Sequence, residues 1–348
     1  MGFTSLTKNH SNFNRLLTWF LSEKSMYVEI EEPWNISLFS QIISQSYSAL
    51  PNQNKELRKA DITIDLLTNE ELLETDPVYL KPILEMKNFV DDHLSEFLHD
   101  FIIHGSIATF DYSKGWSDLD TYVILKSTTI TDHEKLLAFR KKIIEASKYL
   151  YQIDPLQHHG FIFCTEVGLS QYYSHFLPIE VLMQSKSIIR KNTLQLSYKR
   201  TRAEALNAFK QKNAILALAN ESKVLRHHKY NDSYLIENFE NDNAMYQLKY
   251  FLSILMTLPA YYLDAKGSPC YKRDSFEIVE NDFPKNWEII EKATEIRNSW
   301  QDNEIHPYEG NTIPAWVKEI LGYDYFNRAY NLSNQMLASL EETKIKKS

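Results

Sequence analysis

The sequence has little cysteine, little glycine and no disulfide pattern. Its 348 residues include only two cysteines, Cys164 and Cys270, which are too few for a disulfide framework and lack the paired spacing of a zinc site. We therefore predict reduced core cysteines in a cytoplasmic protein. Only 8 residues are glycine, whereas 43% are hydrophobic and 13% aromatic. This composition is typical of a well-packed, helix-rich globular protein and excludes a disordered chain.

Long hydrophobic runs are also missing. The longest apolar run, residues 250–263, is interrupted by Ser253, Thr257 and Pro259, so it predicts a buried helix and not a membrane span. The N-terminus shows no basic, apolar leader, and Leu6 stands where a myristoylation signal needs a hydroxyl residue. We expect a soluble protein with no membrane partner.

Positive charge is scarce and unevenly placed. Lys and Arg number 38 against 46 Asp and Glu, a net charge of -8. Residues 1–189 carry 16 basic against 25 acidic side chains, whereas residues 190–348 carry 22 against 21. Because proteins that bind long nucleic acids present basic surfaces, a long nucleic acid is not the expected partner, although a local groove for RNA stays open. The acidic first half favours a cationic partner.

The central stretch of the chain contains two apolar strands with polar residues at their ends. Residues 101–108 read as a buried strand that enters a sharp turn at Gly105-Ser106, and Asp118-Leu119-Asp120 opens a second strand. Strand alternation places Asp118 and Asp120 on one face. Adjacent carboxylates repel unless a hard divalent cation such as Mg²⁺ binds them, and a Gly-Ser turn is suited to a polyphosphate. The pattern indicates a metal-assisted phosphate site, and a surface hairpin with two chance acids is the alternative.

This arrangement resembles the signature of the DNA polymerase β-like nucleotidyltransferase superfamily, which is a hydrophobic strand, Gly-Ser, a spacer and then Asp-hydrophobic-Asp. The resemblance covers residues 99–126 closely and the rest of the chain only by architecture. It implies that Gly105 and Ser106 bind the outer phosphates of an NTP, with ATP expected, and that Asp118 and Asp120 bind Mg²⁺ as catalytic residues.

The resemblance also implies a third carboxylate on a strand beside the double-acid strand. Glu180 lies in the apolar stretch 177–183, which we predict to be a strand, and an isolated acid there is costly to bury without a partner. Glu180 would join the metal or take the proton of the acceptor. Glu166, in a turn-like setting at a strand end, is the competing residue. The pair His158-His159 receives no role.

Helical periodicity before and after the central stretch predicts an α+β protein: a small mixed-sheet nucleotidyltransferase domain with a helical extension and a helical bundle. Apolar and polar residues alternate over 60–66, which predicts an edge strand or a loop, and residues 27–30 are predicted to form a short strand. From residue 191 onward the pattern is wholly helical. We predict three domains. Residues 1–77 form an N-terminal extension that packs on the catalytic sheet, residues 78–190 form the catalytic domain, and residues 191–348 form a C-terminal bundle.

A second, local resemblance concerns the turn 267–274. It is similar to a turn in the helical domain of aminoglycoside-type nucleotidyltransferases, in which a lysine reaches the nucleotide phosphates, and it implies that role for Lys272. A solvated Lys-Arg pair is the alternative interpretation. Three further basic residues are candidates to meet a triphosphate, namely Lys199, Arg200 and Arg202.

The expected function is metal-dependent transfer of a nucleoside monophosphate from an NTP to an acceptor. The acidic first half favours a small-molecule hydroxyl, such as that of an aminoglycoside, as the acceptor. An RNA 3′ end, a second nucleotide and a protein side chain are alternative acceptors. A non-catalytic nucleotide-binding regulatory protein on the same fold is the alternative of a different class.

Overall fold

The structure, a computed structural model, describes residues 10–22, 36–50, 57–154, 156–157, 159–172, 174, 177–226, 234–238, 244–303 and 313–345. The chain divides into two units, one formed by Met1–Tyr112 and Ser117–Lys199 and the other by Ser113–Trp116 and Arg200–Ser348. The predicted strand at 27–30 and His158 lie outside the described residues.

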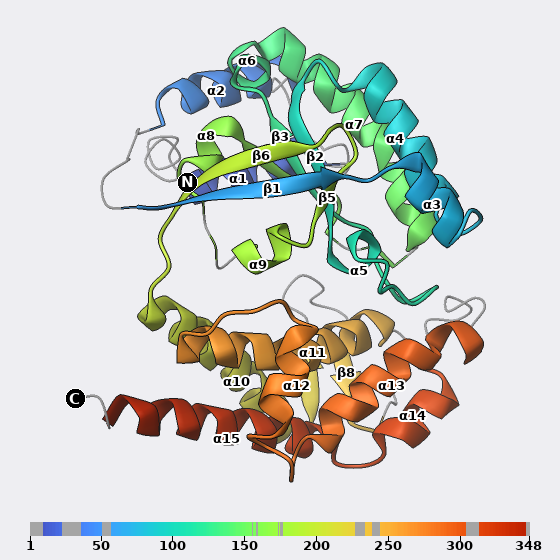
Figure 1. Cartoon of the computed structure of the whole chain (residues 1–348), viewed down its shortest axis with the longest axis vertical. Helices are drawn as coiled ribbons and strands as arrows, with labels where there is room; N and C mark the ends of the chain where they lie inside the picture. Colours follow the sequence, from blue (N-terminus) through green and yellow to red (C-terminus); the bar gives the residue numbers. More distant parts are fainter. Residues whose placement is uncertain are drawn as a thin grey trace. The chain divides into compact units, whose positions relative to one another are not determined.

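The first unit contains a six-stranded mixed sheet (Figure 1), in which the neighbouring strands β1 and β6 alternate buried and exposed residues. Its strand order is β4-β3-β2-β5-β1-β6. The pairs β3–β4 and β1–β5 are parallel, whereas β2 is antiparallel to both β3 and β5, and β6 is antiparallel to β1. The strands are β1 (Arg58–Leu66), β2 (Leu98–His104), β3 (Asp120–Leu125), β4 (Ile162–Thr165), β5 (Lys186–Ser187) and β6 (Asn192–Tyr198).

Both faces of the sheet are covered along β2 and β3, so successive residues of these two strands enter two different cores. Phe101 and Val123 belong to one core, in which α4 and α7 pack, and Ile102 and Tyr122 belong to the other, which α9 closes (Figure 1). This two-sided burial explains why β2 and β3 read as continuous apolar runs. The helices of the first unit are α1 (His10–Phe20), α2 (Ile36–Ser48), α3 (Asn69–Thr75), α4 (Lys81–His93), α5 (Gly105–Ala108), α6 (Ser127–Thr131), α7 (His133–Ile153), α8 (Glu166–Leu169) and α9 (Ile179–Leu182).

The N-terminal helices α1 and α2 pack into the first of these cores. Phe13 and Leu17 of α1 and Ile43 of α2 are fully buried there, and the Arg140 side chain of α7 donates to the Phe20 carbonyl at 2.9 Å. These helices therefore stabilise the sheet directly.

The α+β fold class predicted from the sequence is confirmed, but three local predictions are wrong. Residues 58–66 form β1 between β5 and β6 and not an edge strand or a loop. The stretch 177–183 contains the short helix α9 and not a strand. The chain is not wholly helical from residue 191, because β6 alternates buried Leu194 and Leu196 with exposed residues and pairs with β1. The first unit thus extends to Lys199, beyond the boundary predicted at 190.

The described part of the second unit is mainly helical, as predicted, with one two-stranded antiparallel sheet, β7-β8. Its longest helix, α11, ends at Gly267, where a φ of 94° suits glycine. The last helical stretch is divided into two helices, because Gly322 and Asp324 adopt positive φ angles. The elements are α10 (Arg202–Ser222), β7 (Val224–Arg226), β8 (Tyr234–Ile236), α11 (Met245–Lys266), α12 (Asp274–Glu280), α13 (Glu288–Asn303), α14 (Ala315–Leu321) and α15 (Tyr325–Ile345).

The prediction of core cysteines is confirmed for Cys164, which is buried, but not for Cys270, which is half-buried, and no disulfide joins the two. The apolar run 250–263 lies inside α11, most of whose side chains are buried. Within the described residues, no helix is long and apolar enough to cross a membrane.

Candidate metal site at the start of strand β3

The two predicted acids lie where β2 ends and β3 begins. His104, the last residue of β2, is the Cα partner of Asp120, the first residue of β3. Since side chains that are opposite one another in a strand pair share a face, His104 and Asp120 lie side by side. Both continue the face of Ile102 and Tyr122, beyond the point at which the apolar core stops.

The turn after β2 packs directly against the Asp120 carboxylate. Gly105 has a φ of 71°, and a Cβ atom built on it would lie 2.6 Å from Asp120 Oδ2. No other residue fits this position without a displacement. Ser106 follows in α5, a helix of only four residues. The structure therefore brings Gly105-Ser106 and Asp120 together, as the sequence pattern predicts.

The residue between the two acids anchors them. Leu119 is fully buried in the core, and its carbonyl accepts a hydrogen bond of 3.0 Å from the Gln157 side-chain amide, which is itself buried. This bond also ties the segment between α7 and β4 to the start of β3. The anchor on one side of the chain leaves Asp118 and Asp120 on the other side.

His159, which the sequence argument left without a role, completes the group. Its Nε2 lies 3.3 Å from Asp118 Oδ2 and 3.1 Å from Asp120 Oδ1. Because β4 is parallel to β3, the segments that precede the two strands meet at one edge of the sheet, and His159 enters β4 there as Asp118 enters β3. His159 Nδ1 donates to the Gly160 carbonyl at 3.0 Å, which orients the ring.

The charges of this group are strongly coupled. Burial lowers the pKa of His159, but hydrogen bonds and charge interactions with Asp118 and Asp120 outweigh burial and raise its pKa well above the ordinary value. Burial likewise lowers the pKa of the neighbouring His104, against the smaller opposing influence of Asp120. A proton on His159 and a metal ion are therefore alternative ways to compensate the two carboxylates.

Asp118, Asp120 and His159 can hold a metal ion. One ligand atom from each of them lies within 4.8 Å of the other two. The exposed fraction of the side chain is 27% for Asp118, 28% for Asp120 and 16% for His159. Such partial exposure lets a ligand approach. Two carboxylates and one imidazole are a donor set common in protein metal sites.

The other predicted site residues lie elsewhere. Glu180 is on α9 and, among the described residues, is not a member of the three-residue group. Lys272 immediately precedes Arg273 at the start of α12 and belongs to the second unit. Arg200 contacts Asp264 at 2.9 Å, and Arg202 donates to the carbonyl of Ala265 at 3.1 Å. These two arginines thus join the start of α10 to the end of α11. Lys199 ends the first unit, directly after β6.

Glu166, the competing third acid, lies at the opposite end of the sheet. It follows Thr165, the partner of Leu125 at the far end of β3. Its carboxylate is 3.0 Å from His99 Nδ1 and accepts from the Ser127 backbone at 2.7 Å. Burial raises the pKa of Glu166, but the bonds from Ser127 and His99 prevail and lower it.

We expect Glu166→Gln to destabilise the protein by about 1 kcal/mol at neutral pH, since it weakens charge-assisted hydrogen bonds of a side chain that is 37% exposed. Because the folded-state pKa is lowered, this contribution is present above the ordinary pKa of 4.5 and is lost as the pH falls through the folded-state value. Urea unfolding at several pH values measures it. Glu85→Gln, which alters an exposed pair with Lys81, is the control, and an equal loss in both variants would contradict the prediction.

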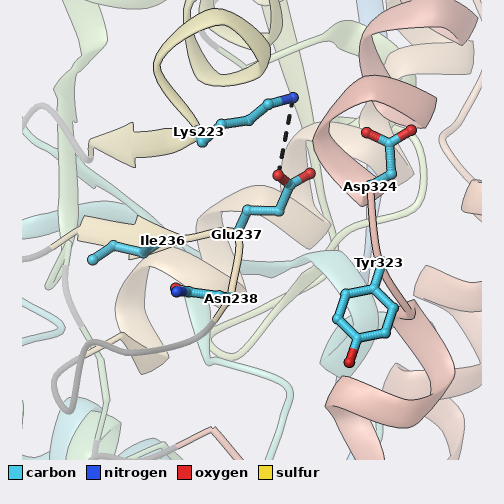
Figure 2. A pocket seen from close by; sticks show the side chains of 6 residues that line it. All are labelled: Lys223, Ile236, Glu237, Asn238, Tyr323 and Asp324. Atoms are coloured by element: carbon cyan, nitrogen blue, oxygen red, sulfur yellow. Dashed lines mark ion pairs between the residues drawn. The ribbon is translucent and has the colours of Figure 1, made fainter.

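The second unit contains a hollow of about 420 Å³ that includes none of the predicted site residues. Figure 2 shows Lys223 and Glu237 pointing toward each other across it, with Nζ 3.9 Å from Oε2. This pair compensates its own charge, so it gives no reason to assign a charged ligand. The lining residues are Lys223, Ile236, Glu237, Asn238, Tyr323 and Asp324.

Comparisons of the chain with models of protein families, with curated proteins and with solved structures find no match. The assignment of a function therefore depends on the residues themselves.

Proposed function

We propose that this protein is a nucleotidyltransferase that moves a nucleoside monophosphate from an NTP to a hydroxyl group of a small molecule and releases pyrophosphate. The observation that supports this proposal most directly is the contact of the Gly105 turn with Asp120, in a group that also contains Asp118 and His159. The Gly-Ser turn, the spacer and the double acid are the signature that this chain shares with the DNA polymerase β-like superfamily.

The residues of the site divide the work by their chemistry. Asp118 and Asp120 supply the negative oxygen ligands for a divalent cation, proposed as Mg²⁺. When bound, such a cation neutralises charge on the phosphoryl oxygens and orients the leaving group. The Gly105 turn lies against the Asp120 side chain, and the backbone N–H groups of Gly105 and Ser106 would bind the outer phosphates.

Two roles rest on the resemblance alone. Glu180 is the proposed acceptor of the hydroxyl proton, although its position on α9 removes the argument from a neighbouring strand. Lys272 is the proposed partner of the NTP phosphates from the second unit. We therefore rest the proposal on the group at the start of β3.

A cationic small molecule is the proposed acceptor because residues 1–189 carry 25 acidic against 16 basic side chains. We expect label from an NTP carrying a radioactive α-phosphate to appear on one or more aminoglycosides but not on total tRNA. Transfer should weaken at higher salt, because exposed charge pairs are screened. The measurement is chromatography of reactions with each NTP, each acceptor and a cell extract, at two salt concentrations.

The outcomes separate the alternatives. Label on tRNA alone would replace the small-molecule acceptor with RNA, and label on a protein of the extract would replace it with a side chain. NTP binding with neither label transfer nor pyrophosphate release would favour a regulatory protein and end the enzyme proposal.

A further inference from the structure

We propose that His159 is a metal ligand and that the site it forms with Asp118 and Asp120 binds Mn²⁺ in preference to Mg²⁺. The inference extends the cation site of the proposed function, but it concerns cation binding alone and does not require the transfer reaction. His159 is not part of the Asp-hydrophobic-Asp pattern, since it lies 39 residues beyond Asp120 in the sequence.

The geometry places an imidazole nitrogen between the two carboxylates. His159 Nε2 is 3.3 Å from Asp118 Oδ2 and 3.1 Å from Asp120 Oδ1. A cation at the centre of three such atoms would replace these contacts with metal bonds after small shifts of flexible side chains. A first-row cation binds oxygen and nitrogen ligands at about 2.0–2.2 Å. The three ligand atoms are already close enough together for one cation between them to contact all three.

The other face of the ring is arranged as a metal-binding histidine needs. His159 Nδ1 contacts the carbonyl oxygen of Gly160 at 3.0 Å. A carbonyl can only accept, so the proton of the ring resides on Nδ1 and the lone pair of the neutral ring resides on Nε2, toward the acids. A hydrogen bond from the distal ring nitrogen to a carbonyl is the usual outer support of a histidine ligand.

A second observation points independently to a ligand at this place. His104 is 7% exposed, and its Nε2 is a buried polar atom with no hydrogen-bond partner among the described residues. It stands opposite Asp120 on the same face of the β2–β3 pair. Since a buried ring nitrogen without a hydrogen-bond partner is unfavourable, a metal-bound water or a metal ion beside Asp120 would supply the missing partner.

The donor set decides the choice of cation. Mg²⁺ takes oxygen ligands almost exclusively, whereas imidazole suits first-row transition metals. Mn²⁺ accepts carboxylates and water as Mg²⁺ does, and, because it is a first-row transition metal ion, it binds an imidazole nitrogen more strongly than Mg²⁺ does. A site with two carboxylates, one histidine ligand and a second histidine beside it therefore fits Mn²⁺ better than it fits Mg²⁺.

The experiment measures Mn²⁺ binding to the full chain by electron paramagnetic resonance, with Mg²⁺ as the competitor. We expect the wild type to retain Mn²⁺ against a 100-fold excess of Mg²⁺, and His159→Gln to weaken Mn²⁺ binding by about 10- to 100-fold while Mg²⁺ affinity changes little. His99→Gln is the matched control, because this histidine also pairs with an acid but lies at the other end of the sheet. Its Mn²⁺ affinity should equal that of the wild type.

The opposite result has a definite meaning. If His159 serves only as a positive counter-charge for the acids, His159→Gln will strengthen the binding of Mn²⁺ and Mg²⁺ alike, and the proposal is overturned. Electron spin-echo modulation from a coordinated nitrogen in the wild-type Mn²⁺ complex provides a readout that does not depend on how well the variant folds. Its absence would also overturn the proposal.

Failure here is distinguishable from failure of the proposed function. A protein that binds both cations equally but labels an acceptor with Mg²⁺ would refute the histidine ligand and keep the transferase. A protein that binds Mn²⁺ through a histidine nitrogen but transfers no label would keep the histidine ligand and refute the transferase.

Discussion

Asp120→Asn is expected to lower nucleotidyl transfer by about 10³-fold or more with almost no loss of stability. Asparagine keeps the shape of the side chain and removes its charge, so the variant loses a negative cation ligand without a cavity. Charge stabilisation of several kcal/mol by a bound cation corresponds to a rate factor of this size. The buried Leu119 and its bond from Gln157, which hold this segment in place, are unaffected. Asp118→Asn should behave in the same way.

Steady-state transfer rates and thermal unfolding, measured on the same preparations, test this expectation. Asp61→Asn on β1 is the matched control, since that side chain is exposed and belongs to the same unit. Transfer by the Asp118→Asn/Asp120→Asn double variant at the wild-type rate would refute a role for the acids. A large fall in melting temperature would show that the pair is structural.

The part of the site that could be predicted from the sequence is the part encoded by local pattern. The Gly105 turn directly follows one apolar strand, and the two acids directly precede another. Strand alternation and the residue preferences of turns therefore locate both features from the sequence. Their contact was also foreseeable, because adjacent antiparallel strands bring the end of one to the start of the next.

His159 could not be assigned in that way, because its position depends on a non-local pairing. Only the parallel register of β3 with β4, in which Tyr122 pairs with Ile162, brings the segment before β4 to the acids. The usable signal was a histidine directly before an apolar strand. Without knowing which strand lies next to β3, that signal fits a surface residue equally well.

Two errors arose from short apolar stretches whose period is ambiguous. In the stretch 177–183 the buried residues Ile179 and Leu182 are three apart, which is helical spacing, and Pro178 at the N-cap suits a helix start as well as a strand start. In 192–198 the alternation of Leu194 and Leu196 with polar residues was a strand signal, but the long helices that follow obscured it.

Gly105→Ala is expected to lose both stability and cation affinity. A side chain at a φ of 71° costs about 1 kcal/mol, and the new Cβ would lie 2.6 Å from Asp120 Oδ2, which forces the carboxylate away from His159. We expect a total loss of about 2–3 kcal/mol in the free energy of unfolding and at least tenfold weaker Mn²⁺ binding. Urea unfolding and paramagnetic resonance measure the two quantities separately.

Gly267→Ala separates backbone strain from the clash. Gly267 has a φ of 94° and nothing within 4 Å of an added Cβ, and it belongs to the second unit, whereas Asp118, Asp120 and His159 belong to the first. It should lose about 1 kcal/mol of stability and no cation affinity. In an Asp120→Ala background, which removes the carboxylate, Gly105→Ala should cost only the same strain, since the two changes are coupled through one contact. An undiminished cost of Gly105→Ala in that background would mean that Gly105 is required for its backbone conformation alone and not for its contact with Asp120.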